Sequence, residues 1–171
     1  MRSSPVTNSM NPTIQEAREF ALTAHGAQQY GDHPYSYHLD AVVGLLEPYG
    51  DQAQIAGYLH DTVEDTPTEP GEIIARFGSE VAEAVSLVSD EPGETRSERK
   101  TKTHAKLAAT TNSLALIVKA ADRLANLLES SKDAANGKLQ MYREENPAFR
   151  AAAYRPGLCD GLWFRIDEII G

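Results

Sequence analysis

The segment "YLHDTVEDT", residues 58–66, holds the side chains of this chain that are best suited to metal chemistry. His60 is followed at once by Asp61, and the acids Glu64 and Asp65 come one helical turn later. If the segment is helical, all of them can border a single pocket. Close carboxylates repel one another, and a divalent cation relieves that repulsion while also accepting a neutral imidazole as a ligand. The alternative is a solvated polar face near a helix end.

Two residues elsewhere in the sequence strengthen the metal interpretation. His38 lies in "PYSYHLD", and Asp122 interrupts the apolar segment "VKAADRLANL". A carboxylate among apolar residues needs a partner if it faces the interior. A salt bridge from Asp122 to Arg123 or Lys119 is an equally good explanation from spacing alone, and a structural histidine is the usual explanation of His38. Together with the His-Asp pair, these residues make a set of two histidines and two aspartates.

The elements that must position these residues are predicted to be helices. The first opens with a capping box, Thr13 and Glu16. Helices are predicted to end at Pro48, Pro67, Pro147 and "RPG". The segment "HPYSYH" is too short to anchor a sheet. The fold class is therefore all-α, a single domain over 12–171 after a disordered N-terminal segment, 1–11. The predicted helices span 13–29, 37–47, 51–66, 69–78, 79–89, 98–110, 113–130, 138–145, 148–154 and 158–170.

Composition excludes several classes of protein. The chain has 171 residues, of which 41% are hydrophobic and 24% charged, as in soluble globular proteins. No apolar run approaches the roughly 20 residues that span a bilayer, so no membrane partner is expected. The first residues lack the apolar centre of a signal peptide, and the single cysteine, Cys159, fits a reducing compartment, which predicts a cytoplasmic location. A net charge of −9 argues against a nucleic-acid partner but permits a small phosphorylated ligand. The sequence leaves the oligomeric state open.

The chain resembles the HD-domain metal-dependent phosphohydrolases, specifically the small alarmone hydrolases related to the hydrolase domain of Rel/Spo proteins. The resemblance runs through "AHGAQQYGDHPYSYH", "YLHDTVEDT", "EIIARFGSEVAEAVSLVSD", "SERK" and "VKAADRLANL", and the order of these motifs is more specific than any one of them. It implies a compact helical bundle that holds one divalent ion, usually manganese. By position the ligands are His38, His60, Asp61 and Asp122.

The resemblance also implies a reaction. The bond broken joins the 3′-oxygen of (p)ppGpp to its pyrophosphate, which gives GDP or GTP plus pyrophosphate. The metal would lower the pKa of a bound water and polarise a phosphoryl oxygen. Glu64 and Asp65 match the acidic pair assigned to the attacking water.

Four further residues match substrate contacts of this family. Asn126, one turn after Asp122, matches an asparagine near the ribose. Arg96 falls where relatives carry a basic phosphate contact, and Lys138 and Tyr142 match another pair. A solvated basic helix face is the alternative explanation of the cations near Arg96.

The sequence departs from the family on the side of the base. Relatives that hydrolyse ppGpp typically carry Arg-Lys about nine residues before the first ligand, where this chain has Gln29 and Tyr30. Three hypotheses follow: an alarmone 3′-pyrophosphohydrolase with altered base recognition, an HD phosphohydrolase of another nucleotide such as ppApp or the 2′-phosphate of NADPH, and a non-catalytic nucleotide sensor. The presence of both Glu64 and Asp65 argues against the sensor.

Overall fold

The computed structural model describes residues 12–171, apart from the side chain of Ala134, and the predicted disordered segment 1–11 lies outside the described residues. Nearly every regular element is a helix, so the predicted all-α class is confirmed. The first half contains α1 (Ile14–His25), β1 (Gln29–Tyr30), β2 (His33–Pro34), α2 (Ser36–Leu46), η1 (Glu47–Tyr49), α3 (Asp51–Leu59), α4 (Thr62–Asp65), α5 (Pro70–Phe77) and α6 (Ser79–Val88). The second half contains α7 (Arg96–Ala109), α8 (Ser113–Ser130), η2 (Ala134–Asn136), α9 (Lys138–Ala153) and α10 (Asp160–Ile170).

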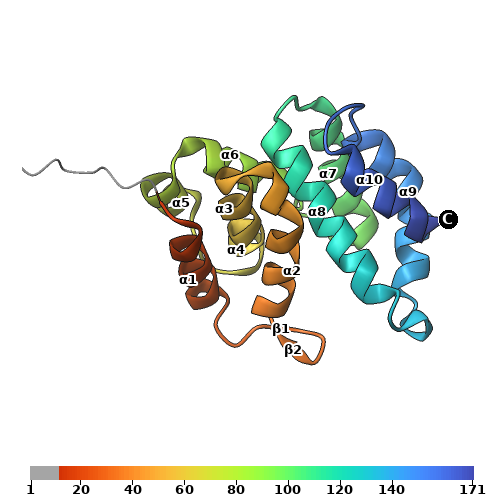
Figure 1. Cartoon of the computed structure of the whole chain (residues 1–171), viewed down its shortest axis with the longest axis horizontal. Helices are drawn as coiled ribbons and strands as arrows, with labels where there is room; N and C mark the ends of the chain where they lie inside the picture. Colours follow the sequence, from red (N-terminus) through yellow and green to blue (C-terminus); the bar gives the residue numbers. More distant parts are fainter. Residues whose placement is uncertain (1–11) are drawn as a thin grey trace, which may run out of the picture.

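Helix α8 is the centre of the molecule. It packs against α2, α3 and α6 on one side and against α9 and α10 on the other, as Figure 1 shows. Its bounds are those that the sequence predicts, because apolar residues recur along it with helical spacing and Asn112 caps its first turn by accepting from the backbone N–H of Ala115. Leu116 and Leu124 are almost fully buried in the core. This long and largely buried helix also carries Asp122.

The start of α1 also forms as predicted. The Thr13 hydroxyl accepts from the backbone N–H of Glu16 at 3.0 Å, and the Glu16 carboxylate accepts from the backbone N–H of Thr13 at 2.7 Å. The predicted end of this helix at residue 29 is wrong, because α1 ends at His25 and Gln29 belongs to a tight hairpin, in which Gln29 pairs with Pro34 and Tyr30 with His33.

The predicted helix over 51–66 is wrong in one respect, because it is broken at the His-Asp pair. Helix α3 ends at Leu59, and a separate short helix, α4, begins at Thr62. The buried Thr62 hydroxyl donates to the Leu59 carbonyl at 2.7 Å, so a side chain replaces part of the helical hydrogen bonding. As a consequence, His60 and Asp61 face the same point, whereas neighbours on a continuous helix diverge by about 100°.

The predicted helix break at Pro147 is also wrong. Pro147 lies inside α9, which runs unbroken from Lys138 to Ala153. The proline removes one backbone donor, but the buried Phe149 and Ala152 hold this stretch against the core. In the segment "HPYSYH" only His33 and Pro34 are extended, as β2, and α2 begins at Ser36.

Helix α10 closes the C-terminal side of the core. Trp163 is 2% exposed, and its ring centre lies 5.4 Å from that of Phe149 and 5.5 Å from that of Tyr154. Cys159, at the start of α10, is buried. In the part of the chain that the structure describes, no helix combines the length and apolar character that a membrane span requires.

Candidate metal centre and its pocket

Four side chains from distant parts of the chain converge on one point. His38 comes from α2, His60 and Asp61 come from the turn between α3 and α4, and Asp122 comes from the middle of α8. Asp122 Oδ1 lies 3.0 Å from His38 Nε2 and 3.2 Å from His60 Nε2. His60 Nε2 also lies 3.0 Å from Asp61 Oδ2. One ligand atom of each residue lies within 4.8 Å of the others, so the four predicted ligands do lie together.

The donor atoms suit a divalent cation. The Nδ1 atom of His60 lies 2.6 Å from the Gly57 carbonyl oxygen, which can only accept, so Nδ1 carries the proton. In the neutral ring, Nε2 then presents a lone pair toward the two aspartates. His38 and His60 are 3% and 2% exposed, which places two nitrogens and two carboxylates in a largely dry site. This mixed set of imidazole and carboxylate ligands is one that divalent ions bind.

The electrostatics of the cluster favour a positive charge at its centre. Burial alone would lower the pKa of His60, but the charges of Asp61 and Asp122 outweigh burial and raise that pKa well above its ordinary value. Burial acts on the pKa of Asp122 in the upward direction, and the two histidines outweigh it, so this pKa lies well below the ordinary value. A divalent cation supplies the same compensation, and its binding to such a site displaces protons.

The alternative explanation of Asp122 as a partner of Arg123 or Lys119 is wrong. Arg123 instead lies 3.4 Å from Glu145, and Lys119 donates to the Val88 carbonyl at 3.1 Å. Asp122 is bonded to the two histidines and to the Asn126 amide.

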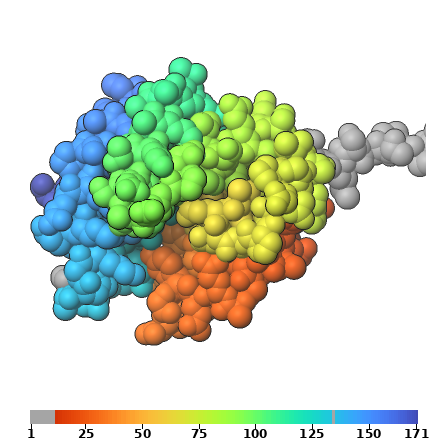
Figure 2. All heavy atoms as spheres, turned by 180° about the vertical axis from the view of Figure 1, so that it is seen from behind, coloured from red at the N-terminus to blue at the C-terminus, as the bar shows by residue number. Residues whose placement is uncertain are grey.

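A polar pocket of about 180 Å³ opens over the cluster. In Figure 2 the segments that contribute to it, from the hairpin and α2 through α4 and α7 to α9, meet on one face of the molecule. The pocket contains most of the residues that the sequence nominates for catalysis or substrate binding. Besides His38, Asp61 and Asp122, its lining consists of Tyr30, Tyr35, Glu64, Asp65, Val88, Asp90, Arg96, Lys100, Lys119, Arg123, Asn126 and Tyr142.

The acidic pair lies on one wall of this pocket. The Glu64 carboxylate accepts from the backbone N–H of Asp90, while Asp65 Oδ2 accepts from Gln28 at 3.2 Å. Partial desolvation raises the pKa of both acids, and the nearby charge of Asp61 raises it further. Both carboxylates therefore lie beside the cluster with increased basicity, which suits a proton acceptor.

Cations also line the pocket. Arg96 forms a two-pronged pair with Glu145, with Nε 2.6 Å from Oε1, and Lys100 lies 2.8 Å from Asp90. Burial, together with the charge of Lys119, lowers the pKa of Lys100. Each cation thus keeps an acid beside it while lining the pocket.

Lys119 and Arg123 were not predicted to line the pocket. Lys119 stands three positions before Asp122, and Asn126 stands four positions after it, so the helical period puts the three on one face of α8. That spacing is the signal that could have identified Lys119. Arg123 has a similar signal, since it stands four positions after Lys119 and three positions before Asn126.

Two predicted substrate contacts lie outside the pocket. Gln29 is exposed and pairs with Pro34 in the hairpin. Lys138 lines a neighbouring hollow of about 200 Å³ between the hairpin and η2. Tyr30 borders both hollows.

Tyr30 contacts the cluster directly. Its ring is stacked on His38 with centres 4.6 Å apart, and its hydroxyl donates to Asn126 Oδ1 at 2.7 Å. Asn126 in turn donates to Asp122 Oδ1 at 3.2 Å. Of the two residues that depart from the family pattern, Tyr30 therefore reaches the site and Gln29 does not.

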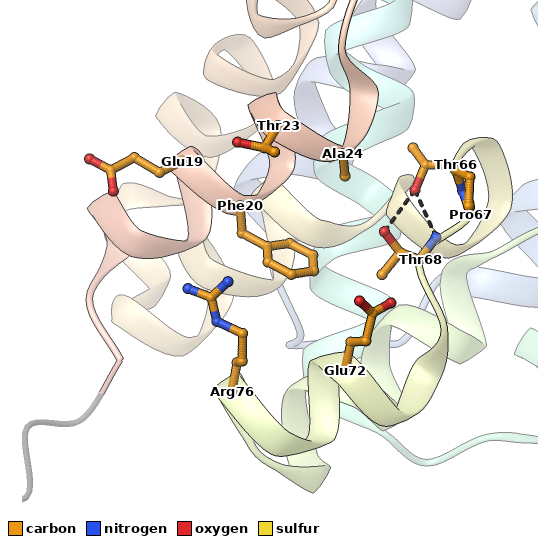
Figure 3. A pocket seen from close by; sticks show the side chains of 9 residues that line it. All are labelled: Glu19, Phe20, Thr23, Ala24, Thr66, Pro67, Thr68, Glu72 and Arg76. Carbon is orange, nitrogen blue, oxygen red and sulfur yellow. Dashed lines mark hydrogen bonds between the residues drawn. The ribbon is translucent and has the colours of Figure 1, made fainter.

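A larger hollow, of about 480 Å³, lies elsewhere, between α1, the turn after α4, and α5 (Figure 3). Figure 3 shows the Arg76 guanidinium directed toward the ring of Phe20, and the distance to the ring centre is 5.0 Å. Glu19 and Glu72 border the same hollow. Volume alone would favour this hollow, but the convergence of titratable groups marks the smaller one as the site.

Comparisons with known proteins identify the family of the chain. A family model described as an HD domain matches residues 17–158. A probable guanosine-3′,5′-bis(diphosphate) 3′-pyrophosphohydrolase of Synechocystis is 34% identical over 152 residues, which cover 84% of this chain and 20% of that protein. The chain thus spans about a fifth of the length of such long relatives.

A relative of similar size and a solved structure extend the likeness. A guanosine-3′,5′-bis(diphosphate) 3′-pyrophosphohydrolase of Danio rerio is 32% identical over 131 residues, 72% of each chain. The solved structure of a metazoan SpoT ortholog that hydrolyses ppGpp superposes with a TM-score of 0.80 at 23% identity, and the match covers 98% of this chain and 96% of that one. At that identity the structural likeness shows the fold.

Proposed function

Because the chain belongs to the HD-domain family, we propose that it is a metal-dependent phosphohydrolase that removes the 3′-pyrophosphate from (p)ppGpp-type alarmones and releases GDP or GTP. One observation carries the proposal. Two histidines and two aspartates meet beside a polar pocket that is also lined by an acidic pair and by several cations. The names of the relatives, which include two pyrophosphohydrolases of ppGpp, support the same substrate class.

The four clustered residues hold the divalent ion, and we propose Mn²⁺ as that ion. When bound, the ion makes hydroxide available near neutral pH and polarises a phosphoryl oxygen. Asp65 and Glu64 orient the attacking water and take its proton, since both carboxylates border the pocket beside Asp61.

The remaining side chains of the pocket bind the substrate. Arg96, Lys100 and Lys119 face the phosphates, where negative charge develops as the bond breaks. Asn126 faces the ribose, and Tyr142 lines the same pocket. Lys138, in the adjoining hollow, contacts the part of the nucleotide that extends past Tyr30.

A second candidate substrate follows from the base side of the site. Tyr30 offers a ring face and a hydroxyl but no charge, and Gln29 lies outside the pocket. Arginine can bond the O6/N7 edge of guanine in two places, and this chain lacks that donor at both positions. A weaker preference for guanine over adenine is therefore expected, which brings ppApp and the 2′-phosphate of NADPH into consideration. The presence of the acidic pair disfavours a sensor without catalysis.

The decisive experiment incubates the Mn²⁺-loaded protein with ppGpp, pppGpp, ppApp and NADPH and resolves the products by ion exchange. Release of pyrophosphate is expected from the alarmones, whereas NADPH would release a single phosphate. Asp122→Asn is the inactive control, and Asp40→Asn, on the same helix as His38 but bonded to Arg18, is the matched active control. The proposal would be refuted if the Mn²⁺-loaded protein hydrolysed none of the four nucleotides.

The role of the hairpin is tested by substitution toward the family pattern. The variant Gln29→Arg, Tyr30→Lys is expected to gain ppGpp activity relative to ppApp, measured as a ratio of kcat/KM values. Gln29→Arg alone is the control, since Gln29 does not line the pocket. If the natural protein already prefers ppGpp strongly and the double variant leaves the ratio unchanged, these positions do not read the base.

A further inference from the structure

The side chain of Gln28, which follows α1, connects a buried histidine to the acidic pair. Its Oε1 atom lies 2.8 Å from His25 Nδ1, and its Nε2 atom donates to Asp65 Oδ2 at 3.2 Å. His25 is 6% exposed, and its ring lies against Tyr35 with centres 4.4 Å apart. A continuous set of contacts thus runs from the interior of the protein to the wall of the pocket.

The hydrogen-bonding capacities of these groups fix the direction of every bond. An ionised carboxylate only accepts, so the Gln28 amide turns its NH₂ group toward Asp65 and its oxygen toward His25. That oxygen only accepts, so His25 must carry its proton on Nδ1. His25 Nε2 is buried without a partner among the described residues, which suits a bare lone pair better than a second N–H.

The two oxygens of Asp65 are consequently in different situations. Oδ2 accepts from Gln28 and faces the Tyr35 hydroxyl at 3.5 Å. Among the described residues no donor reaches Oδ1, although Asp65 lines the pocket. Gln28 therefore holds one oxygen and leaves the other for a water molecule. Asp65 itself belongs to a four-residue helix at the surface, which constrains its side chain little.

We propose that His25 and Gln28 are positioning residues that orient the Asp65 carboxylate toward the attacking water. The inference rests on the proposed function and adds two residues to its machinery. Glu64 needs no such positioning side chain, because the backbone N–H of Asp90 already donates to its carboxylate.

A purely structural role in closing the turn after α1 explains these side chains less well. The backbone closes that turn by itself, since the N–H of Gln28 donates to the His25 carbonyl at 3.0 Å and the Gln28 carbonyl accepts from the N–H of Tyr35 at 3.1 Å. The side-chain bonds run in addition to this turn and end on a residue of the pocket.

The test compares variants that differ only in hydrogen bonding. Gln28→Met keeps the length of the side chain but removes both bonds. It is expected to lower kcat about tenfold, a part of the roughly 10²–10⁴-fold that a positioned general base contributes, with KM and metal affinity unchanged. His25→Asn retains a donor near the position of Nδ1 and should keep most of the activity, whereas His25→Phe should lose as much as Gln28→Met. In an Asp65→Ala background, Gln28→Met should cost nothing further. An equal loss in both backgrounds would overturn the proposal.

A measurement independent of turnover separates this inference from the proposed function. ¹⁵N NMR of the imidazole is expected to show His25 with its proton on Nδ1 in the wild type. That signature should be lost or weakened in Gln28→Met and also in Asp65→Ala, because the carboxylate orients the amide. If the wild type hydrolysed no nucleotide of the panel, the proposed function would fail. The NMR result would then decide by itself whether His25 is connected to Asp65 through Gln28. A His25 signal that does not change in Asp65→Ala would exclude this connection.

Discussion

Removal of the divalent ion should cost the protein several degrees of thermal stability. The four clustered residues come from α2, from the turn between α3 and α4, and from α8, so a bound ion joins three segments that otherwise meet through packing. The unfolded chain does not bring these donors together. The ion therefore binds the folded state preferentially, and its binding free energy adds to the free energy of unfolding.

The expected magnitude follows from this linkage. Free metal at 100 times its dissociation constant adds about 2.7 kcal/mol to the free energy of unfolding. A domain of this size changes its Tm by about 2–4 °C for each kcal/mol. The Tm should therefore rise by roughly 5–11 °C between the chelator-treated and the Mn²⁺-saturated protein.

The assay is thermal unfolding followed by circular dichroism, with Mn²⁺ titrated into the chelator-treated protein. Asp122→Asn should abolish most of the metal-induced rise, because a central carboxylate becomes an amide. Asp40→Asn is the matched control: Asp40 bonds Arg18 at 2.9 Å and Tyr58 at 2.7 Å, so its loss lowers the Tm while the full metal-induced rise remains. A full rise in Asp122→Asn, or none in the wild type at saturating Mn²⁺, would refute the assignment of the site.

Three other experiments, two on variants and one on the wild type, have expected outcomes. The double variant Glu64→Ala, Asp65→Ala should keep the metal-induced rise in Tm yet lose about 10²-fold or more in kcat, and unchanged turnover would remove both acids from the mechanism. Arg96→Ala should weaken the binding of phosphorylated ligands by roughly 1.5–3 kcal/mol, increasingly with phosphate charge; an equal loss for a nucleoside would indicate misfolding instead. Cys159 should resist alkylation at pH 8 in the folded protein, because burial, with the charge of Asp160, raises its pKa to about 11, and rapid labelling would contradict this.

The parts of the structure that depend on local pattern could be predicted from the sequence. The bounds of α8 follow from its apolar period, and the capping box at Thr13 follows from residue type and spacing. The break after Leu59 could not be predicted, since it depends on how a buried Thr62 hydroxyl competes with the backbone. The helix break predicted at Pro147 does not form, because the packing of a whole helix outweighs one missing hydrogen bond.

Some residues of the candidate site could also be predicted from the sequence, whereas others could not. The clustered histidines and aspartates could be nominated from residue type, spacing and family resemblance, and the fold brings them together. The contact of Gln28 with Asp65 could not be predicted, because the two residues are 37 positions apart and no local pattern pairs them. Tyr30 was expected near the base, but its bond to Asn126 directs it toward the ligands.

The burial of Trp163 among Phe149 and Tyr154 has a consequence for spectroscopy. It is the only tryptophan of the chain, so its emission reports on the C-terminal helices. The pocket is lined instead by tyrosines, including Tyr30 and Tyr35. Red-edge excitation, which selects tryptophan over the tyrosines, therefore follows the C-terminal helices, while circular dichroism follows the helices of the whole chain. If the tryptophan emission melts at a higher temperature than the circular dichroism signal as the metal is withdrawn, other parts of the fold loosen before the helices that enclose the tryptophan.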